Sequence, residues 1–380
     1  MILKITNDAL DYAWGSKTLI PDYFGTEATG GPMAEIWLGT HPSNPSKLVD
    51  EAGTDLLAKL GHQLTFLLKV LAADRPLSLQ AHPNSKQAAA GFSRENKAGV
   101  ALTAAARNYK DDKHKPEMIV ALMPGFEALV GFRPLAQVNE ILSELASQPG
   151  ELGEYAAEWL AQADDLKKLF SSMLMLGTRA RPLIQQLVQV EAVAESTRDA
   201  IAVAAEVAQD FGADPGVFVT LLMNHVTLKA AEALAVPAGQ LHAYLRGIGV
   251  EVMAESDNVL RGGLTKKHID LRELEQVLVF ESVVPELVAT ESLAKGLTLY
   301  KSDFDDFLLY RIDLNGSTVL ADLNLPGEGI LLCTSGQLVV SNSLGETATL
   351  RRSEAAYLAN DARLFTLSSS GTGYFVTASK

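Results

Sequence analysis

Apolar and polar positions change their spacing twice along the chain. In residues 1–133, short apolar runs are separated by Gly, Pro, Asn and Asp, which is typical of strands joined by loops. Residues 66–71 and 77–79 are predicted strands, whereas residues 85–107 have a helical pattern. Residues 134–223 are rich in Ala, Leu, Glu and Gln with apolar positions three or four apart, which predicts several helices.

Strand-like segments return after this helical block, at about Val226, and a second strand-rich region begins at about Glu291. In that region, residues 329–340 are predicted to form a hairpin and residues 373–377 the last strand. All 7 histidines precede residue 269, so the C-terminal region holds no histidine-based metal site.

Composition and charge restrict the function classes. A chain of 380 residues with 47% hydrophobic and 21% charged residues is long enough for two or three soluble domains. No apolar run approaches the roughly 20 residues of a membrane-spanning helix, so we expect no membrane association. A net charge of -14 disfavours binding to nucleic acid. The single cysteine, Cys333, favours a reducing compartment, and the N-terminus reaches Asp8 before a signal-type apolar region forms. A cytoplasmic protein is therefore expected. A monomer is expected as well, although these patterns do not set the oligomeric state.

Two histidines, a carboxylate and an amide occur in three short motifs far apart in the chain. They are Gln80, His82, Glu117 and His242. Gln80 and His82 are two residues apart, so in a strand they point to the same face. A single histidine beside a proline is more often a loop or core residue, but histidines and carboxylates among apolar strand residues are rare unless paired or metal-bound. Because Zn²⁺ accepts imidazole nitrogen and carboxylate oxygen, the set predicts a zinc site with a position open for substrate.

The helical block lies between these candidate ligands, since Gln80 and Glu117 precede it and His242 follows it. It is therefore predicted to be an insertion into one metal-binding β domain. Distant strands that converge on one ion are typical of the interior of a β-barrel.

Four motifs in order resemble the signatures of the type I mannose-6-phosphate isomerase family. They are residues 77–83, 113–117, 236–244 and 257–265, and residues 12–15 and 34–42 resemble the opening of the same family. One small departure is Ala81, whose side chain is expected to point away from the ion.

The resemblance implies a mainly β fold with an inserted α-helical domain and two cupin-like double-stranded β-helix, or jelly-roll, barrels. The implied division is a catalytic cupin domain in residues 1–133 and 225–290, a helical domain in residues 134–224, and a C-terminal cupin-like domain without a metal site in residues 291–380.

The resemblance also implies an activity, the zinc-dependent interconversion of mannose 6-phosphate and fructose 6-phosphate through a cis-enediol(ate). One Zn²⁺ per chain would be held by the four candidate ligands, and the family's catalytic arginine falls on Arg261. The expected partner is thus a small sugar phosphate.

Such a reaction needs a base, an acid and an electrophile that holds the developing oxyanion. Arg261 suits the oxyanion or the phosphate, because a guanidinium stays charged and the two glycines after it leave room for substrate. Lys115 and Glu251 are predicted to transfer protons: zinc would lower the pKa of a nearby lysine, and a carboxylate between valines is otherwise costly. Glu251 is alternatively a residue that orients a metal ligand.

Contacts to the substrate are predicted from strand alternation and charge. Ser78 and Tyr244 share a face with ligands two residues away, and Lys69 is a charged residue within an apolar strand. Lys267 adds positive charge near the motifs, which the site of an acidic protein needs in order to attract an anion. His114 is expected to be structural, because it points away from the ligand face.

Two other functions remain open. Two histidines and a carboxylate also describe the Fe(II) site of non-haem oxygenases. Gln80 argues against that class, because a fourth protein ligand fills a position needed by O₂ and its cosubstrate. A non-catalytic, metal-stabilised sugar-binding cupin is the other alternative.

Overall fold

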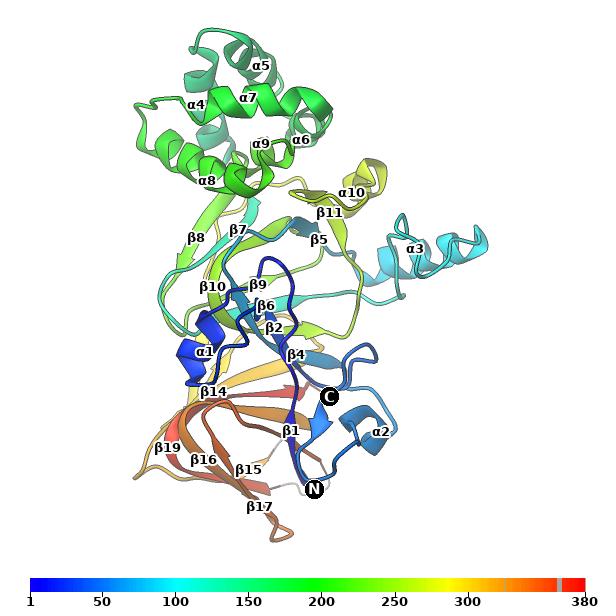
Figure 1. Cartoon of the computed structure of the whole chain (residues 1–380), viewed down its shortest axis with the longest axis vertical. Coiled ribbons are helices and arrows are strands. Elements are labelled where there is room, and N and C mark those ends of the chain that lie inside the picture. The colour runs from blue at the N-terminus through cyan, green and yellow to red at the C-terminus, as the bar shows by residue number, and fades with distance from the viewer. Residues whose placement is uncertain (325, 361–363, 380) are drawn as a thin grey trace.

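The computed structural model describes residues 1–324, 326–360 and 364–379. Figure 1 shows three parts stacked along the long axis: a helical block at one end, a nine-stranded sheet in the middle and a ten-stranded sheet at the other end. Strand pairing is antiparallel in both sheets. The predicted fold class, mainly β with an inserted helical domain, is confirmed. Among the described residues, no helix has both the length and the apolar character needed to cross a membrane.

The middle sheet curls around the candidate site. Its strands are β2 (Glu35–Leu38), β4 (Phe66–Ala73), β5 (Leu79–Ala81), β6 (Glu117–Ala121), β7 (Phe126–Phe132), β8 (Met223–Leu228), β9 (Ala233–Val236), β10 (His242–Ala254) and β11 (Leu260–Gly263). The first half of β10 pairs with β5 and β7, and the second half pairs with β4 and β6.

The change of partners within β10 occurs at Gly247. This residue has a φ of 116°, and a Cβ there would lie 2.7 Å from the Cα of Phe126. Only glycine fits such a close approach of two backbones. The bend lets one strand serve two halves of the sheet.

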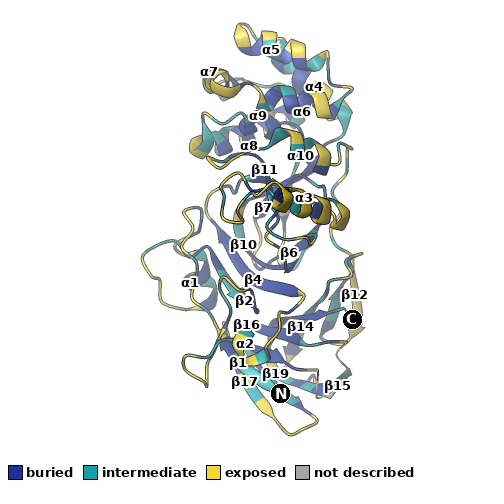
Figure 2. Ribbon diagram, turned by 90° about the vertical axis from the view of Figure 1, so that its right-hand side faces the viewer, coloured by how far each residue is buried: buried dark blue, intermediate teal, exposed yellow. Residues whose placement is uncertain are grey.

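Side-chain alternation decides which residues face the interior of this barrel. In the half of the barrel where β10 pairs with β4 and β6, the residues that point outward form one core with the ten-stranded sheet. They include Phe66, Leu68, Val70, Met118, Val120, Val250 and Val252. Because successive side chains of a strand point to opposite faces, Lys69, Glu117 and Glu251 point inward. All eight residues of β4 are buried, since the strand is covered on both faces (Figure 2).

The inserted helices cover the other half of the barrel. They are α4 (Leu135–Ala146), α5 (Glu151–Leu160), α6 (Leu166–Leu174), α7 (Ala180–Leu187), α8 (Glu195–Phe211) and α9 (Gly216–Thr220), with a 3₁₀ turn at Gly177–Arg179. Their apolar faces share a core with the outward residues Leu79, Ala81 and Ala243. Ala81 thus points toward the helices, which confirms the predicted alternation around Gln80.

Four further helices lie outside this block: α1 (Leu19–Phe24), α2 (Leu56–Leu60), α3 (Ser85–Lys97) and α10 (Leu271–Val277). The helix predicted for residues 85–107 is too long. It begins with a capping box at Asn84 and ends at Lys97. Two residues later, Gly99 has a φ of 71°, and this left-handed conformation cannot continue a helix.

The ten-stranded sheet contains most of the C-terminal region. Its strands are β1 (Ile2–Thr6), β3 (Lys47–Leu48), β12 (Thr290–Ala294), β13 (Leu297–Tyr300), β14 (Phe307–Asn315), β15 (Leu320–Asn324), β16 (Gly329–Asn342), β17 (Thr347–Arg351), β18 (Ala355–Leu358) and β19 (Leu364–Ala378). Residues 373–377 lie in the last strand, as predicted.

The hairpin predicted for residues 329–340 is wrong, because this segment is part of the single strand β16. The register shifts between Cys333 and Ser335, and Gly336 follows with a φ of 64°. A β-bulge takes up the extra residue, so both halves of β16 continue along β19 without reversing direction.

The first strand also differs from the expectation, which placed residues 1–133 with the catalytic barrel. Strand β1 pairs with β18, with Ile2 opposite Leu358, and β3 pairs with β1. Ile5 is buried in the core between the two sheets. Strand propensity indicates that a strand forms but not which edge it joins. The division at the other boundaries stays a prediction.

Candidate metal centre and active site

A cluster of three potential metal-binding side chains lies inside the nine-stranded barrel. His82, Glu117 and His242 are buried, and one ligand atom of each lies within 4.8 Å of the others. The His82 Nε2 atom is 3.3 Å from Glu117 Oε1, and the His242 Nε2 atom is 3.4 Å from Glu117 Oε2. The three residues come from both sides of the helical insertion.

Backbone carbonyls orient both imidazole rings. His82 Nδ1 lies 2.7 Å from the carbonyl oxygen of Asn258, and His242 Nδ1 lies 3.1 Å from that of Gln240. Each Nδ1 must carry a proton to donate to a carbonyl, so the lone pair of the neutral ring lies on Nε2, which faces Glu117. This carbonyl-to-histidine pattern is the one that metal-binding histidines use.

The His82 ring provides a direct test of whether a cation fits. Its Nε2 atom is buried and has no hydrogen-bond partner in the described structure. Burial lowers the pKa of His82 from 6.5 to about 4, which outweighs the opposite effect of Glu117. The ring is therefore neutral near pH 7, which is the form that binds metal. A buried lone pair of this kind is costly unless a cation occupies the space in front of it.

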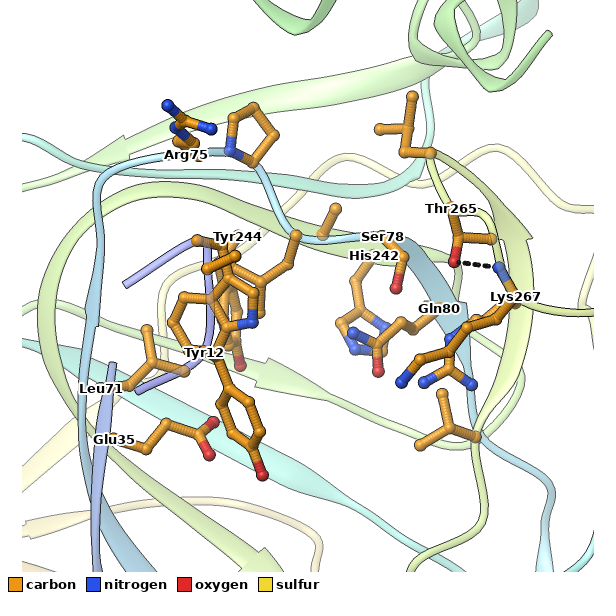
Figure 3. A pocket seen from close by; sticks show the side chains of 18 of the residues that line it. Tyr12, Glu35, Leu71, Arg75, Ser78, Gln80, His242, Tyr244, Thr265 and Lys267 are labelled. Carbon is orange, nitrogen blue, oxygen red and sulfur yellow. Dashed lines mark hydrogen bonds between the residues drawn. The ribbon is translucent and has the colours of Figure 1, made fainter. Parts of the chain in front are cut away.

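Gln80 lies next to this cluster. On β5 it is the register partner of His242 on one side and of Arg261 on the other. Figure 3 shows the Gln80 and His242 side chains pointing into the same part of the pocket. An amide oxygen at this position suits a fourth ligand.

Glu117 is also paired with a lysine two residues before it. Lys115 Nζ lies 2.8 Å from Glu117 Oε1, and both side chains are buried. Burial by itself raises the pKa of Glu117, but Lys115 and the two histidines hold it well below its usual range. The carboxylate therefore stays ionised and able to bind a cation.

A second buried charge network lies on the neighbouring strands. Lys69 Nζ is 3.0 Å from Glu251 and 3.7 Å from Glu35. Burial would lower the pKa of Lys69, but Glu251 and Glu35 raise it above its ordinary value. Trp37 donates a 2.7 Å hydrogen bond from its indole nitrogen to Glu35, and Lys69 lies over the Trp37 ring at 5.2 Å.

Burial raises the pKa of Glu251, with a further rise from Glu117, although Lys69 acts in the opposite direction. Burial likewise raises the pKa of Tyr244 well above its ordinary value, so its phenol stays protonated. The sequence motifs assigned no role to Glu35. The sequence did offer a signal for Glu35: it lies two residues before Trp37 on β2, so both side chains are on the same face of the strand.

These groups open into a cavity of about 640 Å³. Its walls include the predicted residues Lys69, Ser78, Gln80, Lys115, Glu117, His242, Tyr244, Glu251, Arg261 and Lys267. His82 lies behind this wall, against Glu117. Tyr12, Trp14, Arg75, Asp210 and Phe211 also contribute, and none of these was predicted. Asp210 and Phe211 come from the end of α8, so the helical insertion supplies part of the wall.

One side of the cavity is strongly cationic. Arg261 is half-buried, and burial lowers its pKa with no carboxylate among the described residues to raise it. The positive charge of Arg261, followed by burial, lowers the pKa of Lys267. The backbone N–H of Lys267 donates to Thr265 Oγ1 at 3.0 Å, which shapes the loop beside Arg261 (Figure 3).

His114 lies outside the metal cluster, as predicted. Its Nε2 atom is 2.8 Å from Asp306, on the connection before β14. The contact ties the loop before β6 to the C-terminal part of the chain.

Comparisons with known proteins identify the family. A family profile, phosphomannose isomerase type I, catalytic domain, matches residues 2–135. The mannose-6-phosphate isomerase of Escherichia coli K12 is 33% identical over 375 residues, covering 94% of each chain. This chain belongs to the type I phosphomannose isomerase family. The Salmonella typhimurium relative is 34% identical over 391 residues and covers 97% of each chain, and the human relative is 30% identical and covers 88% of each.

Solved structures of the family have the same fold. The Salmonella typhimurium mannose 6-phosphate isomerase bound to its substrate fructose 6-phosphate and zinc has a TM-score of 0.86 and 31% identity, with 100% of both chains covered. A zinc-bound holo mannose 6-phosphate isomerase gives the same TM-score of 0.86. The resemblance predicted from the sequence motifs is thus confirmed.

Proposed function

We propose that this protein is a zinc-dependent aldose–ketose isomerase that interconverts mannose 6-phosphate and fructose 6-phosphate. The observation that carries the proposal is the buried cluster of His82, Glu117 and His242, with a lone pair on His82 that lacks a partner, beside a cavity with a cationic side. Membership of a family whose relatives are mannose-6-phosphate isomerases supports the substrate.

The metal would be held by His82, Glu117 and His242, with Gln80 as the fourth protein ligand. Two nitrogens and two oxygens at these positions suit Zn²⁺. A zinc ion bound there supplies a Lewis acid that polarises a carbonyl or hydroxyl oxygen of the sugar. The Gln80 amide distinguishes this set from the three-ligand site of Fe(II) oxygenases.

The cationic side of the cavity would bind the phosphate. Arg261 offers a rigid fork of N–H donors that suits an oxyanion, and no carboxylate of the described residues neutralises it. Lys267 adds a second charge beside it. Such a local field allows a protein with a net charge of -14 to attract an anion.

Glu251 and Lys115 are the proposed proton-transfer groups. Isomerisation removes a proton from carbon, returns it to the neighbouring carbon and moves another between the two oxygens, through a cis-enediol(ate). Burial raises the pKa of Glu251 and so makes it a stronger base than an ordinary carboxylate, which suits this exchange. Lys69, 3.0 Å from Glu251, would hold the carboxylate in place. The hydroxyls of Ser78 and Tyr244 are placed to donate hydrogen bonds to the sugar.

We further propose the four-part domain division at residues 133, 224 and 290, with β1 and β3 added to the C-terminal sheet. We also propose a monomer in the cytoplasm. The single cysteine, Cys333, is buried and free, which suits a reducing compartment. Light scattering after size-exclusion chromatography tests the oligomeric state.

The activity is tested by a coupled assay that follows fructose 6-phosphate formation from mannose 6-phosphate, before and after chelation and with Zn²⁺ added back. We expect loss of activity on chelation and recovery with about one equivalent of zinc per chain. Active protein after verified metal removal would contradict the zinc assignment. Zinc-loaded protein that binds mannose 6-phosphate without converting it would support the sugar-binding alternative.

A further inference from the structure

Behind the metal cluster, a fully buried asparagine contacts one of the candidate ligands. Asn258, in the loop between β10 and β11, has an exposed fraction of 0%. Its backbone carbonyl accepts the 2.7 Å hydrogen bond from His82 Nδ1. This bond directs His82 Nε2 toward Glu117, because the two ring nitrogens lie on opposite sides of the imidazole. The orientation of His82 therefore depends on where this one carbonyl lies.

The side chain of Asn258 anchors a second loop. Its Oδ1 atom accepts from the backbone N–H groups of Lys110 at 2.7 Å and Asp111 at 3.2 Å. Its Nδ2 atom donates to the carbonyls of Asp111 at 2.9 Å and Lys113 at 2.8 Å. An asparagine amide can donate two hydrogen bonds and accept two, so its capacity is fully used. The anchored segment leads directly to Lys115 and Glu117.

Asp111, in the loop that Asn258 anchors, forms hydrogen bonds back to the loop that contains Asn258. Its carboxylate accepts from the Ser256 hydroxyl at 2.8 Å and from the backbone N–H of Asp257 at 2.8 Å. The Ser256 hydroxyl in turn accepts from the backbone N–H of Asn258 at 3.2 Å. Segments 110–113 and 255–258 are thus cross-linked by side chains from both.

We propose that Asn258 is a positioning residue for the metal centre. Three parts of the site meet at it: His82 through its carbonyl, the segment before Glu117 through its side chain, and Arg261 three residues further along the chain. Loss of the side chain would remove the partner of the half-buried N–H groups of Lys110 and Asp111 and release the two loops from each other. The loops then shift, and the carbonyl that orients His82 shifts with them.

The test measures metal binding rather than turnover. Full-length protein, wild type and Asn258→Ala, is stripped with a chelator and titrated with Zn²⁺ against a chromophoric competitor. Loss of a group that orients a metal ligand commonly weakens binding about 10- to 100-fold, and we expect a weakening in this range. The visible spectrum of the Co²⁺-loaded variant should also change, because it reports the geometry of the ligands.

A matched control is available in the other sheet. Asn342 is also buried, and it accepts from the backbone N–H groups of Leu344 and Glu346 in the turn between β16 and β17. Asn342→Ala removes a comparable set of hydrogen bonds far from the metal cluster. It should leave the zinc affinity and the Co²⁺ spectrum unchanged even if it lowers the melting temperature.

Ser256→Ala provides a milder variant in case Asn258→Ala fails to fold. It removes the hydroxyl that donates to Asp111 and accepts from the backbone N–H of Asn258 but leaves the Asn258 side chain in place, and we expect zinc binding about two- to tenfold weaker. Zinc affinity equal to that of Asn342→Ala in the folded variants would overturn the inference. The inference rests on the proposed zinc site. If the wild-type protein binds no stoichiometric zinc, the proposed function itself fails, so the two failures are distinguishable.

Discussion

Acidification is expected to destabilise the metal-free protein through His82. The ring is fully buried, and burial lowers its pKa from 6.5 to about 4. Between these two values the unfolded chain binds a proton that the folded protein does not. Stability contributed by His82 is therefore complete above pH 6.5 and is lost as the pH falls toward 4.

The size of the effect follows from the two pKa values. The whole interval between 6.5 and about 4 corresponds to roughly 3.4 kcal/mol, at about 1.36 kcal/mol for each pKa unit. Between pH 7.5 and pH 5.0 the same relation gives a loss of about 2 kcal/mol. Two other histidines act with the opposite sign, because hydrogen bonds to carboxylates raise the pKa of His62 and of His114.

The contribution of His82 is isolated by comparison with a variant. Urea unfolding of chelator-treated protein would be followed by tryptophan fluorescence at pH 7.5 and pH 5.0, for the wild type and for His82→Gln. The wild type should lose about 2 kcal/mol more than the variant over this interval, because only the wild type carries the titrating ring. Equal losses in the two proteins would refute the argument that burial keeps this ring neutral.

Two substitutions test the remaining charge networks. Lys69→Met leaves the buried carboxylate of Glu251 without its 3.0 Å partner and should lower the free energy of unfolding by about 3–5 kcal/mol, measured by thermal or urea unfolding. The double variant Lys69→Met/Glu251→Gln should recover part of this loss, because it also removes the unpaired carboxylate. Arg261→Lys keeps the positive charge but loses the planar fork, and kcat/KM for mannose 6-phosphate should fall about ten- to a hundredfold.

Each of these tests has its own control. If the double variant is no more stable than Lys69→Met, the carboxylate of Glu251 is not the source of the instability. Arg246→Lys is the matched control for Arg261→Lys. Arg246 is half exposed, lies outside the cavity and pairs with Glu127 at 2.7 Å. A similar loss of kcat/KM in both lysine variants would show that the arginine fork of Arg261 has no special role.

Local patterns in the sequence placed the helical block, several strands and the inward faces of the strands that carry the site. The spacing of two residues between Gln80 and His82 puts both on one side of β5, and apolar alternation in β4 and β10 turns Lys69 and Glu251 inward. The order of the motifs around the helical block also indicated an insertion. These are properties of periodicity, which depends only on neighbouring residues.

Pairing between distant segments was decided by the tertiary structure. Sequence periodicity indicated neither that β1 joins β18 nor that the segment around Gly336 continues as one strand. It also assigned no role to Glu35, which shares Lys69 with Glu251, or to Asn258, whose carbonyl orients His82. Such contacts arise because register and loop packing join residues that are far apart in the chain. The sequence by itself therefore indicated ten of the groups that face the cavity, and the folded chain decided which further residues join them and which groups share an ion pair or a carbonyl.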